Sequence, residues 1–163
     1  MEIVSDTVQE ITQIRSHCGY FYLDDWSVIS CSGKDIVEYL QTQTTNDVKE
    51  LTVGKGQNNA ICDRKGKLIA AFSGHKTEDF SILLLSETVQ KELLVQHLDS
   101  FIFREDVTLS DPEGVDCLLA VQGPKSGLIL ETLTESLKLP LKPNDVVSFD
   151  LDKHKGFIIN KSL

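Results

Sequence analysis

The sequence predicts an α+β fold with mostly antiparallel sheets and with helices packed on one face. Helical and strand-like segments are mixed along the 163 residues, without the regular strand–helix–strand alternation that builds a parallel sheet. Two of the strand-like runs are joined by Asp63-Arg64-Lys65-Gly66, a tight turn of the kind that connects antiparallel neighbours. A chain of this length buries one core, or two small cores that share an interface.

The first third of the chain is predicted to form a helix, two strands and a second helix. Apolar residues recur at helical spacing at Val8, Ile11 and Ile14. Strands are expected at 20–23 and 27–31. The second helix begins after residues 32–35, which have the spacing of a capping box. Its inward-facing residues are expected to be Ile36, Val37 and Leu40.

The middle third is predicted to form three strands and a helix. The strands are expected at 57–62, 67–74 and 79–85, and Gly66 can take the positive φ that the first turn requires. Ser86 can cap the helix that follows. The apolar stripe of this helix is expected at Val89, Leu93, Leu94 and either His97 or Leu98.

The last third is predicted to contain a short strand at 107–109, a longer strand, a helix and a final hairpin. The run 115–122 is almost continuously apolar, so it is expected to be a central strand that is covered on both faces. Pro124 suits the first turn of the next helix. The buried face of that helix is expected at Leu130, Leu133 and Leu137. The hairpin is formed by 145–151 and 156–160.

Composition and patterning argue against several kinds of partner and site. The net charge of −9 disfavours nucleic acid, because phosphate-backbone binding relies on clustered Lys and Arg. The longest apolar runs are too short to cross a bilayer, and residues 1–10 do not resemble a signal peptide. The four cysteines lack paired spacing, which indicates reduced thiols and a cytoplasmic protein. No metal site is predicted, because the adjacent His17 and Cys18 would not face one point.

Five short motifs, in this order along the chain, resemble one protein family. They are Val28-Ile29-Ser30-Cys31-Ser32-Gly33-Lys34-Asp35, the run from Tyr39 through Gln43 to Asn46-Asp47-Val48, Asp63-Arg64-Lys65-Gly66-Lys67, Phe103-Arg104-Glu105-Asp106-Val107 and Gln122-Gly123-Pro124. On these motifs, residues 20–163 resemble the N-terminal half of a folate-binding superfamily. That superfamily contains the glycine-cleavage T-protein, an aminomethyltransferase, and the YgfZ-type iron–sulfur assembly factors.

The resemblance implies an incomplete T-protein/YgfZ-like folate-binding fold. Residues 1–52 together with 140–163 are expected to be parts of a first, split domain. Residues 53–139 are expected to form a ferredoxin-like α+β domain. The C-terminal remainder of the family fold is expected to be absent, as in a truncated product, and a naturally short paralogue is the alternative.

One position sets the expected function. T-protein relatives carry an Asp-Asp pair after the hairpin glycine, and one of these acids is the catalytic carboxylate. Counted from Gly66, the corresponding residues are Ile69 and Ala70, which cannot hold a charge or relay a proton. The chain therefore resembles the YgfZ-type branch more closely. The expected function is a non-catalytic, folate-binding factor that supports iron–sulfur protein maturation, with iron–sulfur client proteins as partners and no catalytic residue.

Tetrahydrofolate is the cofactor that the resemblance implies, and a pterin needs apolar walls with a few matched amide or carboxylate groups. The candidate binding residues are Asn46, Asp47, Asn58, Asn59, Asp63 and Phe72. Each polar candidate also has a local alternative. Asn46 and Asp47 can turn the chain, Asn58 and Asn59 can begin an edge strand, and Asp63 can initiate its own turn.

Two other functions stay open. The first is a tetrahydrofolate-dependent aminomethyltransferase, because most of the motifs are common to both branches. The second is an interaction module without a ligand, in which the C-terminal hairpin at 156–163 associates with a second copy through a free strand edge. A redox role is disfavoured, because Cys62, the thiol expected to be most exposed, has no second cysteine near it in sequence.

Overall fold

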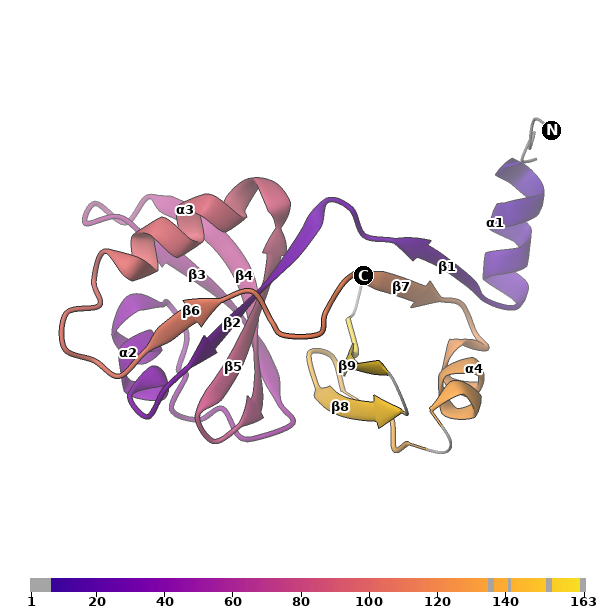
Figure 1. Cartoon of the computed structure of the whole chain (residues 1–163). Helices are drawn as coiled ribbons and strands as arrows, with labels where there is room; N and C mark the ends of the chain where they lie inside the picture. The colour runs from indigo at the N-terminus through magenta and orange to yellow at the C-terminus, as the bar shows by residue number, and fades with distance from the viewer. Residues whose placement is uncertain (1–6, 135–136, 141, 152–153, 162–163) are drawn as a thin grey trace. The chain divides into compact units, whose positions relative to one another are not determined.

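The computed structural model of the chain (Figure 1) describes residues 7–134, 137–140, 142–151 and 154–161. It divides into two compact units. The smaller unit comprises Met1–Leu23 with Asp116–Leu139, and the larger comprises Asp24–Val115 with Pro140–Leu163. The predicted division at 52/53 and 139/140 into family domains stays a prediction. None of the described helices is long and apolar enough to cross a membrane.

The larger unit is built on a five-stranded antiparallel sheet in the order β3-β4-β5-β2-β6 (Figure 1). Its strands are β2 (Trp26–Ser32), β3 (Gly56–Cys62), β4 (Leu68–Glu78), β5 (Ser81–Glu87) and β6 (Thr108–Ser110). These strands confirm the predicted α+β class with antiparallel sheets. A ferredoxin-like arrangement of the middle portion stays a prediction.

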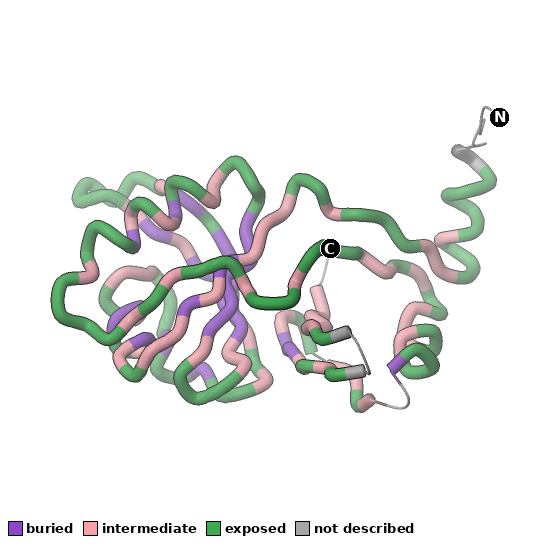
Figure 2. The backbone as a smooth tube through the Cα atoms, in the orientation of Figure 1, coloured by how far each residue is buried: buried purple, intermediate pink, exposed green. Residues whose placement is uncertain are grey.

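The main core lies between this sheet and two helices, α2 (Ile36–Gln43) and α3 (Thr88–Asp99). Alternate residues of the strands belong to this core, as the period of two in a strand requires. Strands β4 and β5 are in addition buried on both faces over 72–75 and 82–86 (Figure 2). The core side chains are Ile29, Cys31, Ile36, Tyr39, Leu40, Val48, Ile61, Ala70, Phe72, Ile82, Leu84, Leu94 and Leu98. The hydroxyl of Tyr39 donates to the carbonyl oxygen of Leu98 and so ties the two helices together.

The prediction for α3 is only partly right. Leu94 and Leu98 are buried as expected, but Val89 is 80% exposed and Leu93 is also exposed. The face toward the sheet instead continues to Gln90, whose side-chain oxygen accepts a hydrogen bond from the N–H of Ala71 at 2.8 Å. Residues 90, 94 and 98 are spaced by four, so they define one stripe that excludes 89 and 93. The cap is also different, because Ser86 is the buried partner of Ser27 in β5 and Glu87 precedes the helix.

The smaller unit contains α1 (Thr7–Ser16), β1 (Gly19–Tyr22), β7 (Leu119–Gln122) and α4 (Ser126–Leu133). Strands β1 and β7 form a two-stranded antiparallel sheet. Gly123 has φ 127°, and a Cβ there would lie within 2.7 Å of the carbonyl oxygens of Ile14 and His17, so this position requires glycine. The α1–β1 turn and the start of α4 are thereby held close together.

Two predictions for this unit are wrong. Strand β7 is not central and covered, since within the part of the chain that the structure describes it pairs only with β1, and Leu119 is 48% exposed. Leu133 on α4 is 65% exposed instead of buried. An apolar run predicts burial only if another layer covers it, and among the described residues a two-stranded sheet with two short helices provides too little cover.

The C-terminal hairpin, β8 (Val146–Leu151) and β9 (His154–Ile159), belongs to the larger unit and forms as predicted. The tip of its turn, residues 152–153, lies outside the described residues, as do residues 162–163. The hairpin is attached at the start of β3. The N–H of Val146 donates to the carbonyl oxygen of Gly54 at 3.0 Å, and the Lys55 ammonium lies 2.7 Å from a carboxylate oxygen of Asp145.

Candidate functional site

Three of the predicted site residues lie together where the loop after α2 meets β3. The N–H of Asn46 donates to the side-chain oxygen of Asn59 at 2.9 Å. The side-chain amide of Asn46 donates to the carbonyl oxygen of Asn58 at 3.1 Å. Thr45 adds two further bonds with Ala60, one through its N–H and one through its hydroxyl. The loop is therefore fastened to the edge strand of the sheet.

Asp47 and Asp63 each bond to the backbone of their own turn. One carboxylate oxygen of Asp47 accepts the N–H of Lys49 at 3.1 Å. One oxygen of Asp63 accepts the N–H groups of Lys65 and Lys67 at 2.8 and 2.9 Å. These contacts match the local alternatives foreseen for both residues. Both side chains are exposed, and their part in ligand binding stays a prediction.

Phe72 and Asn59 are buried on the core side of the sheet, where they line a small cavity. Its walls are Leu40, Thr44, Val48, Leu51, Gln57, Asn59, Phe72, Gly74, Ile82 and Leu84. The cavity offers about 10 Å³ to the centre of a water-sized sphere. That is room for one water molecule and not for a bicyclic pterin ring. The walls of this cavity therefore do not fit a pterin.

Asn58 and Asn59 point to opposite sides of β3, because neighbouring residues of a strand alternate. Asn59 faces the core, whereas Asn58 lies opposite Ser73 and is exposed. The side-chain oxygen of Asn58 lies 3.4 Å from the side-chain nitrogen of Asn144, a long hydrogen bond. One flat ligand cannot lie against both asparagine side chains. The six candidates therefore divide into buried and exposed residues.

No acid occupies the two positions that correspond to the family's Asp-Asp pair. Ala70 is 1% exposed within the core, and Ile69 packs against the same core. Among the described residues, the buried carboxylate is that of Asp145, where the hydrogen bond from Lys55 lowers the pKa of the carboxyl group. This acid pairs with a cation at the start of β3 and does not replace the missing group.

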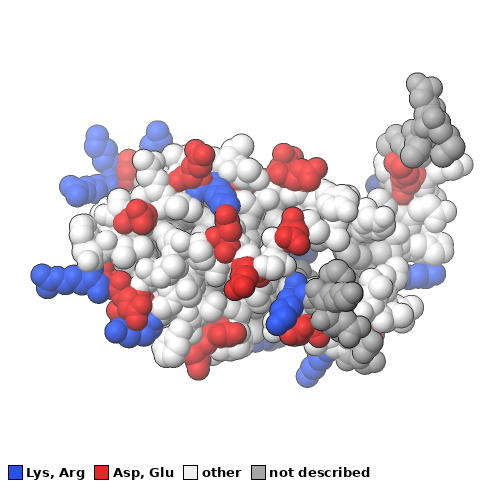
Figure 3. All heavy atoms as spheres, viewed as in Figure 1, with Lys and Arg blue, Asp and Glu red and all other residues white. Residues whose placement is uncertain are grey.

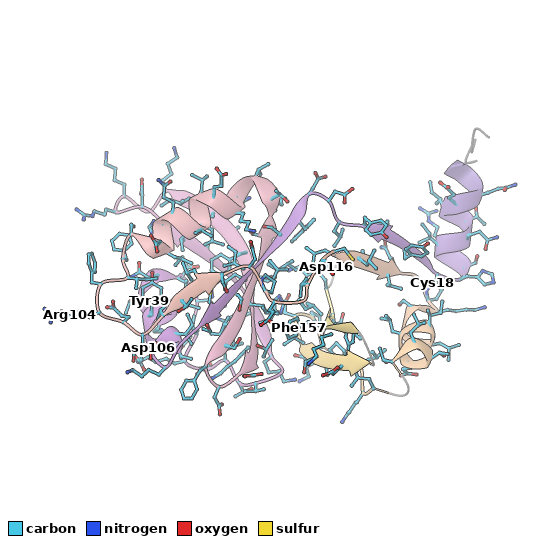
Figure 4. All side chains as sticks on the ribbon, in the orientation of Figure 1. Cys18, Tyr39, Arg104, Asp106, Asp116 and Phe157 are labelled. Carbon is cyan, nitrogen blue, oxygen red and sulfur yellow. The ribbon has the colours of Figure 1, made fainter. Side chains whose placement is uncertain are left out.

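Exposed charged side chains do not gather into one patch of a single sign on the face that Figure 3 shows. Arg104 points away from the sheet (Figure 4). Its neighbour Asp106 lies 3.6 Å from the ammonium of Lys34 in an exposed ion pair. The N–H groups of Arg104 and Phe103 donate to the carboxylate of Glu105 and lower its pKa. The carboxylates of Glu105 and Asp106 therefore both have partners within the described residues.

A buried polar cluster, which the sequence did not indicate, joins the hairpin to the opposite face of the sheet. We call it the Ser73 cluster, and its members are Ser73, His75, Asn144 and Lys161. The hydroxyl oxygen of Ser73 lies 2.9 Å from Nε2 of His75 and 3.0 Å from Nζ of Lys161. Nδ1 of His75 lies 2.9 Å from the carbonyl oxygen of Asn144.

The donors and acceptors of the Ser73 cluster form a directed chain. The Lys161 ammonium can only donate, so the Ser73 hydroxyl accepts a hydrogen bond from it and donates its own hydrogen bond to Nε2 of His75. Nδ1–H of His75 then donates to the Asn144 carbonyl, an assignment that follows from the network. The ring is neutral in this arrangement. Burial, assisted by the charge of Lys161, lowers the pKa of His75 to about 4, and burial also lowers the pKa of Lys161.

The Ser73 cluster resembles an activated nucleophile, but its burial argues for a structural role. A serine hydroxyl that donates to a histidine ring nitrogen is the arrangement of many acyl-transfer sites. Ser73 is 1% exposed and His75 is 0% exposed, so a substrate does not reach the hydroxyl. The cluster instead fastens the segments just before β8 and just after β9 to β4. The only signal in the sequence was the pair of polar residues at 73 and 75 on one face, because their partners are 69 and 88 residues away.

The thiols differ from expectation at one position. All four cysteines are free, with Cys31 buried in the core, where burial raises the pKa of its thiol to about 12. Cys62 is half-buried, and the exposed thiol is that of Cys117. The prediction that Cys62 is the most exposed cysteine is therefore wrong. Cys117 lies just before β7 in the smaller unit. It belongs to the apolar run 115–122, which the sequence predicts to be a covered strand.

Comparison with known proteins identifies the family. The model of the GCVT N-terminal domain matches residues 2–151. The aminomethyltransferase of Bacillus velezensis is 30% identical over 143 residues, which are 85% of this chain and 38% of that protein. The aminomethyltransferase of Bacillus subtilis gives the same identity and coverage. The chain thus spans well under half the length of these relatives.

A solved structure shows the same fold. The glycine cleavage system aminomethyltransferase T from Bartonella henselae superposes with a TM-score of 0.77, covering 91% of this chain and 43% of that chain. The sequence identity is 17%, so this likeness concerns the fold alone.

These findings correct the expected function. A role as a YgfZ-type factor in iron–sulfur protein maturation is wrong, because the relatives described above are named aminomethyltransferases. The same names favour the enzyme alternative over the expected absence of catalysis. The motifs common to both branches therefore outweigh the substitution of the acid pair by Ile69 and Ala70. With its family model matched over residues 2–151, the chain belongs to the GCVT N-terminal domain family of the T-protein superfamily.

Proposed function

We propose that the chain takes part in tetrahydrofolate-dependent aminomethyl transfer, as the N-terminal portion of an aminomethyltransferase-type protein. The observation that carries this proposal is the family match over residues 2–151. The 30% identity to relatives named aminomethyltransferase supports it. Tetrahydrofolate, when bound, supplies the acceptor for the one-carbon unit.

In this proposal the larger unit contributes one wall of the pterin site. Its own cavity, of about 10 Å³, is too small for the ring. The chain also corresponds to only 38% of the Bacillus relatives' length. Binding of the pterin therefore requires further parts of the family fold beside this unit.

Three of the predicted site residues are the ones that we expect to contact ligand directly. Asn46, Asp47 and Asn58 are exposed at the junction of the loop after α2 with β3. Asn59 and Phe72 are buried behind them and support the loop and the strand. Asp63 is expected to contribute less, because its carboxylate already accepts two N–H groups of its turn.

The test is tetrahydrofolate-dependent release of ammonia from an aminomethyl-lipoyl carrier protein. It is measured on the chain and on a longer version that carries the remaining part of the family fold. We expect the longer version to be active, at a rate about 100-fold or more below the Bacillus subtilis relative, because positions 69 and 70 carry no proton-transferring group. Absence of any tetrahydrofolate-dependent release from both forms would overturn the proposal.

Self-association is a second candidate, and the exposed apolar residues of the smaller unit favour it. The large side chains exposed there include Tyr20, Tyr22, Leu119, Leu128 and Leu133. Within the described residues, β8 and β9 pair only with each other, which leaves a strand edge for a second copy. Sedimentation velocity over a range of concentrations measures this. A single concentration-independent monomer would end this candidate.

A further inference from the structure

One buried side-chain nitrogen in the described part of the chain has no hydrogen-bond partner. It is Nε2 of Gln57, on β3. A buried amide donor that makes no hydrogen bond loses its interaction with water and gains nothing in return, which destabilises the fold. Native structures seldom retain such an atom unless an ordered molecule supplies the missing bond.

Gln57 lies at the wall of the small cavity on the core side of the sheet. It is directly opposite Gly74 on β4, and glycine has no side chain to fill the space in front of the amide. A Cβ at Gly74 would meet side-chain atoms of Ile82 and Leu84 at 3.8 Å, an ordinary van der Waals contact, so one extra carbon atom fits there without a clash. The missing partner and the empty volume are therefore in the same place.

Rotation of the Gln57 amide by half a turn does not remove the problem. It would exchange Nε2 for Oε1 and leave a buried carbonyl oxygen at the wall instead of a buried donor. A water molecule can accept from the nitrogen or donate to the oxygen. It is the smallest molecule that serves either orientation, and the available volume suits it.

Two further polar side chains line the same cavity. The hydroxyl of Thr44 donates to the carbonyl oxygen of Leu40 at 2.8 Å, so its oxygen keeps a lone pair for a second donor. The side-chain oxygen of Asn59 accepts the N–H of Asn46. A buried water usually has two to four polar partners, and these groups supply them. The other walls are mostly apolar and exclude a charged occupant.

We propose that this cavity binds one ordered water molecule, held by the side chain of Gln57 between β3, β4 and the end of α2. The water lies behind the bonds that fasten the loop at Thr44–Asn46 to β3. It thereby supports from the core side the exposed surface formed by Asn46 and Asn58. Gln57 is a positioning residue for that loop and does not itself face a ligand.

The test is a crystal structure of the chain at atomic resolution, together with NMR transfer of magnetisation from water to the Gln57 side-chain amide. We expect one density peak about 2.9 Å from the Gln57 amide. We also expect a cross-peak to water that reports a long residence time. Gln57→Leu should lose both. Asn58→Leu replaces the neighbouring amide side chain, which is on the opposite face of β3, and should keep both signals.

Three results would overturn the proposal. One is an empty cavity in the wild-type crystal, and another is a Gln57 amide bonded to a protein atom. The third is a Gln57→Leu variant that unfolds at higher urea concentration than wild type, because removing a donor from a dry cavity stabilises the fold. If Gln57→Leu does not fold, the wild-type density and cross-peak decide the question alone.

Discussion

At the residue scale, the larger unit contains a neutral histidine whose two ring nitrogens both have partners. His75 donates to the Asn144 carbonyl and accepts from Ser73, while Lys161 completes the Ser73 cluster. Adding a proton to Nε2 would leave the Ser73 hydroxyl between two donors. The cluster is therefore stable only while the ring stays uncharged.

The burial of His75 predicts a dependence of stability on pH. Its pKa is about 4 in the folded chain, compared with about 6.5 in the unfolded chain. The unfolded state thus binds more protons between these values, so the stabilisation is fully present above pH ~6.5 and is lost as pH falls toward ~4. The loss should reach about 3 kcal/mol. Urea unfolding at a series of pH values measures it, with His75→Gln as the reference for all other groups. Equal pH profiles for the two proteins would contradict the neutral, buried ring.

Ser73→Ala should destabilise the chain by about 1–3 kcal/mol, because it leaves Nε2 of His75 without its partner and removes the shorter of two hydrogen bonds of the Lys161 ammonium. Ser110→Ala, an exposed serine on the edge strand β6, is the matched control and should change stability by less than about 0.5 kcal/mol. Chemical denaturation compares the two variants. Similar unfolding midpoints for both would show that the Ser73 hydroxyl contributes little.

At the element scale, the C-terminal hairpin depends on close contact with β3. Gly56 is opposite His75, and a Cβ at Gly56 would lie 2.2 Å from the carbonyl oxygen of Asn144 and 2.4 Å from Nδ1 of His75. Asn144 itself has φ 65°, a conformation that asparagine tolerates better than most residues. The backbone of the segment before β8 therefore packs directly against β3 with no room for a side chain.

Gly56→Ala should detach this segment and destabilise the chain by about 1–3 kcal/mol. Gly74→Ala is the matched control on the paired strand, where the added carbon meets atoms only at 3.8 Å. Hydrogen exchange of the amides in β8 and β9 should become faster in the first variant and stay close to wild type in the second. Equal protection in the two variants would mean that the hairpin is held elsewhere.

The elements differ in how far the sequence predicted them. Strands β3, β4 and β5 alternate and are separated by turns such as Asp63–Gly66, so local pattern was sufficient. Strand β7 looked central because it is apolar, but coverage depends on layers that are distant in sequence. The Ser73 cluster was not predictable, since Asn144 is 69 residues from His75 and Lys161 is 88 residues from Ser73. Within the candidate site, the structure brings Asn46 together with Asn58 and Asn59. The sequence did not predict that these residues would form hydrogen bonds with one another.

At the scale of the whole molecule, the chain combines a well-packed unit with one that exposes many apolar side chains. The larger unit contains the whole main core cluster. Of the side chains that the structure describes in the smaller unit, only Thr134 is buried. Large exposed apolar patches usually mark surfaces that associate with other protein. This contrast is consistent with a chain that works beside further parts of the family fold.

The measurement that tests the central claim most directly is calorimetric titration of tetrahydrofolate into the chain and into a longer version that carries the rest of the family fold. The proposed function predicts saturable binding to the longer version, weaker or unmeasurable binding to the chain alone, and loss of affinity in Asn58→Ala but not in the exposed control Ser110→Ala. No saturable heat from either protein would contradict the claim that this chain forms part of a tetrahydrofolate site.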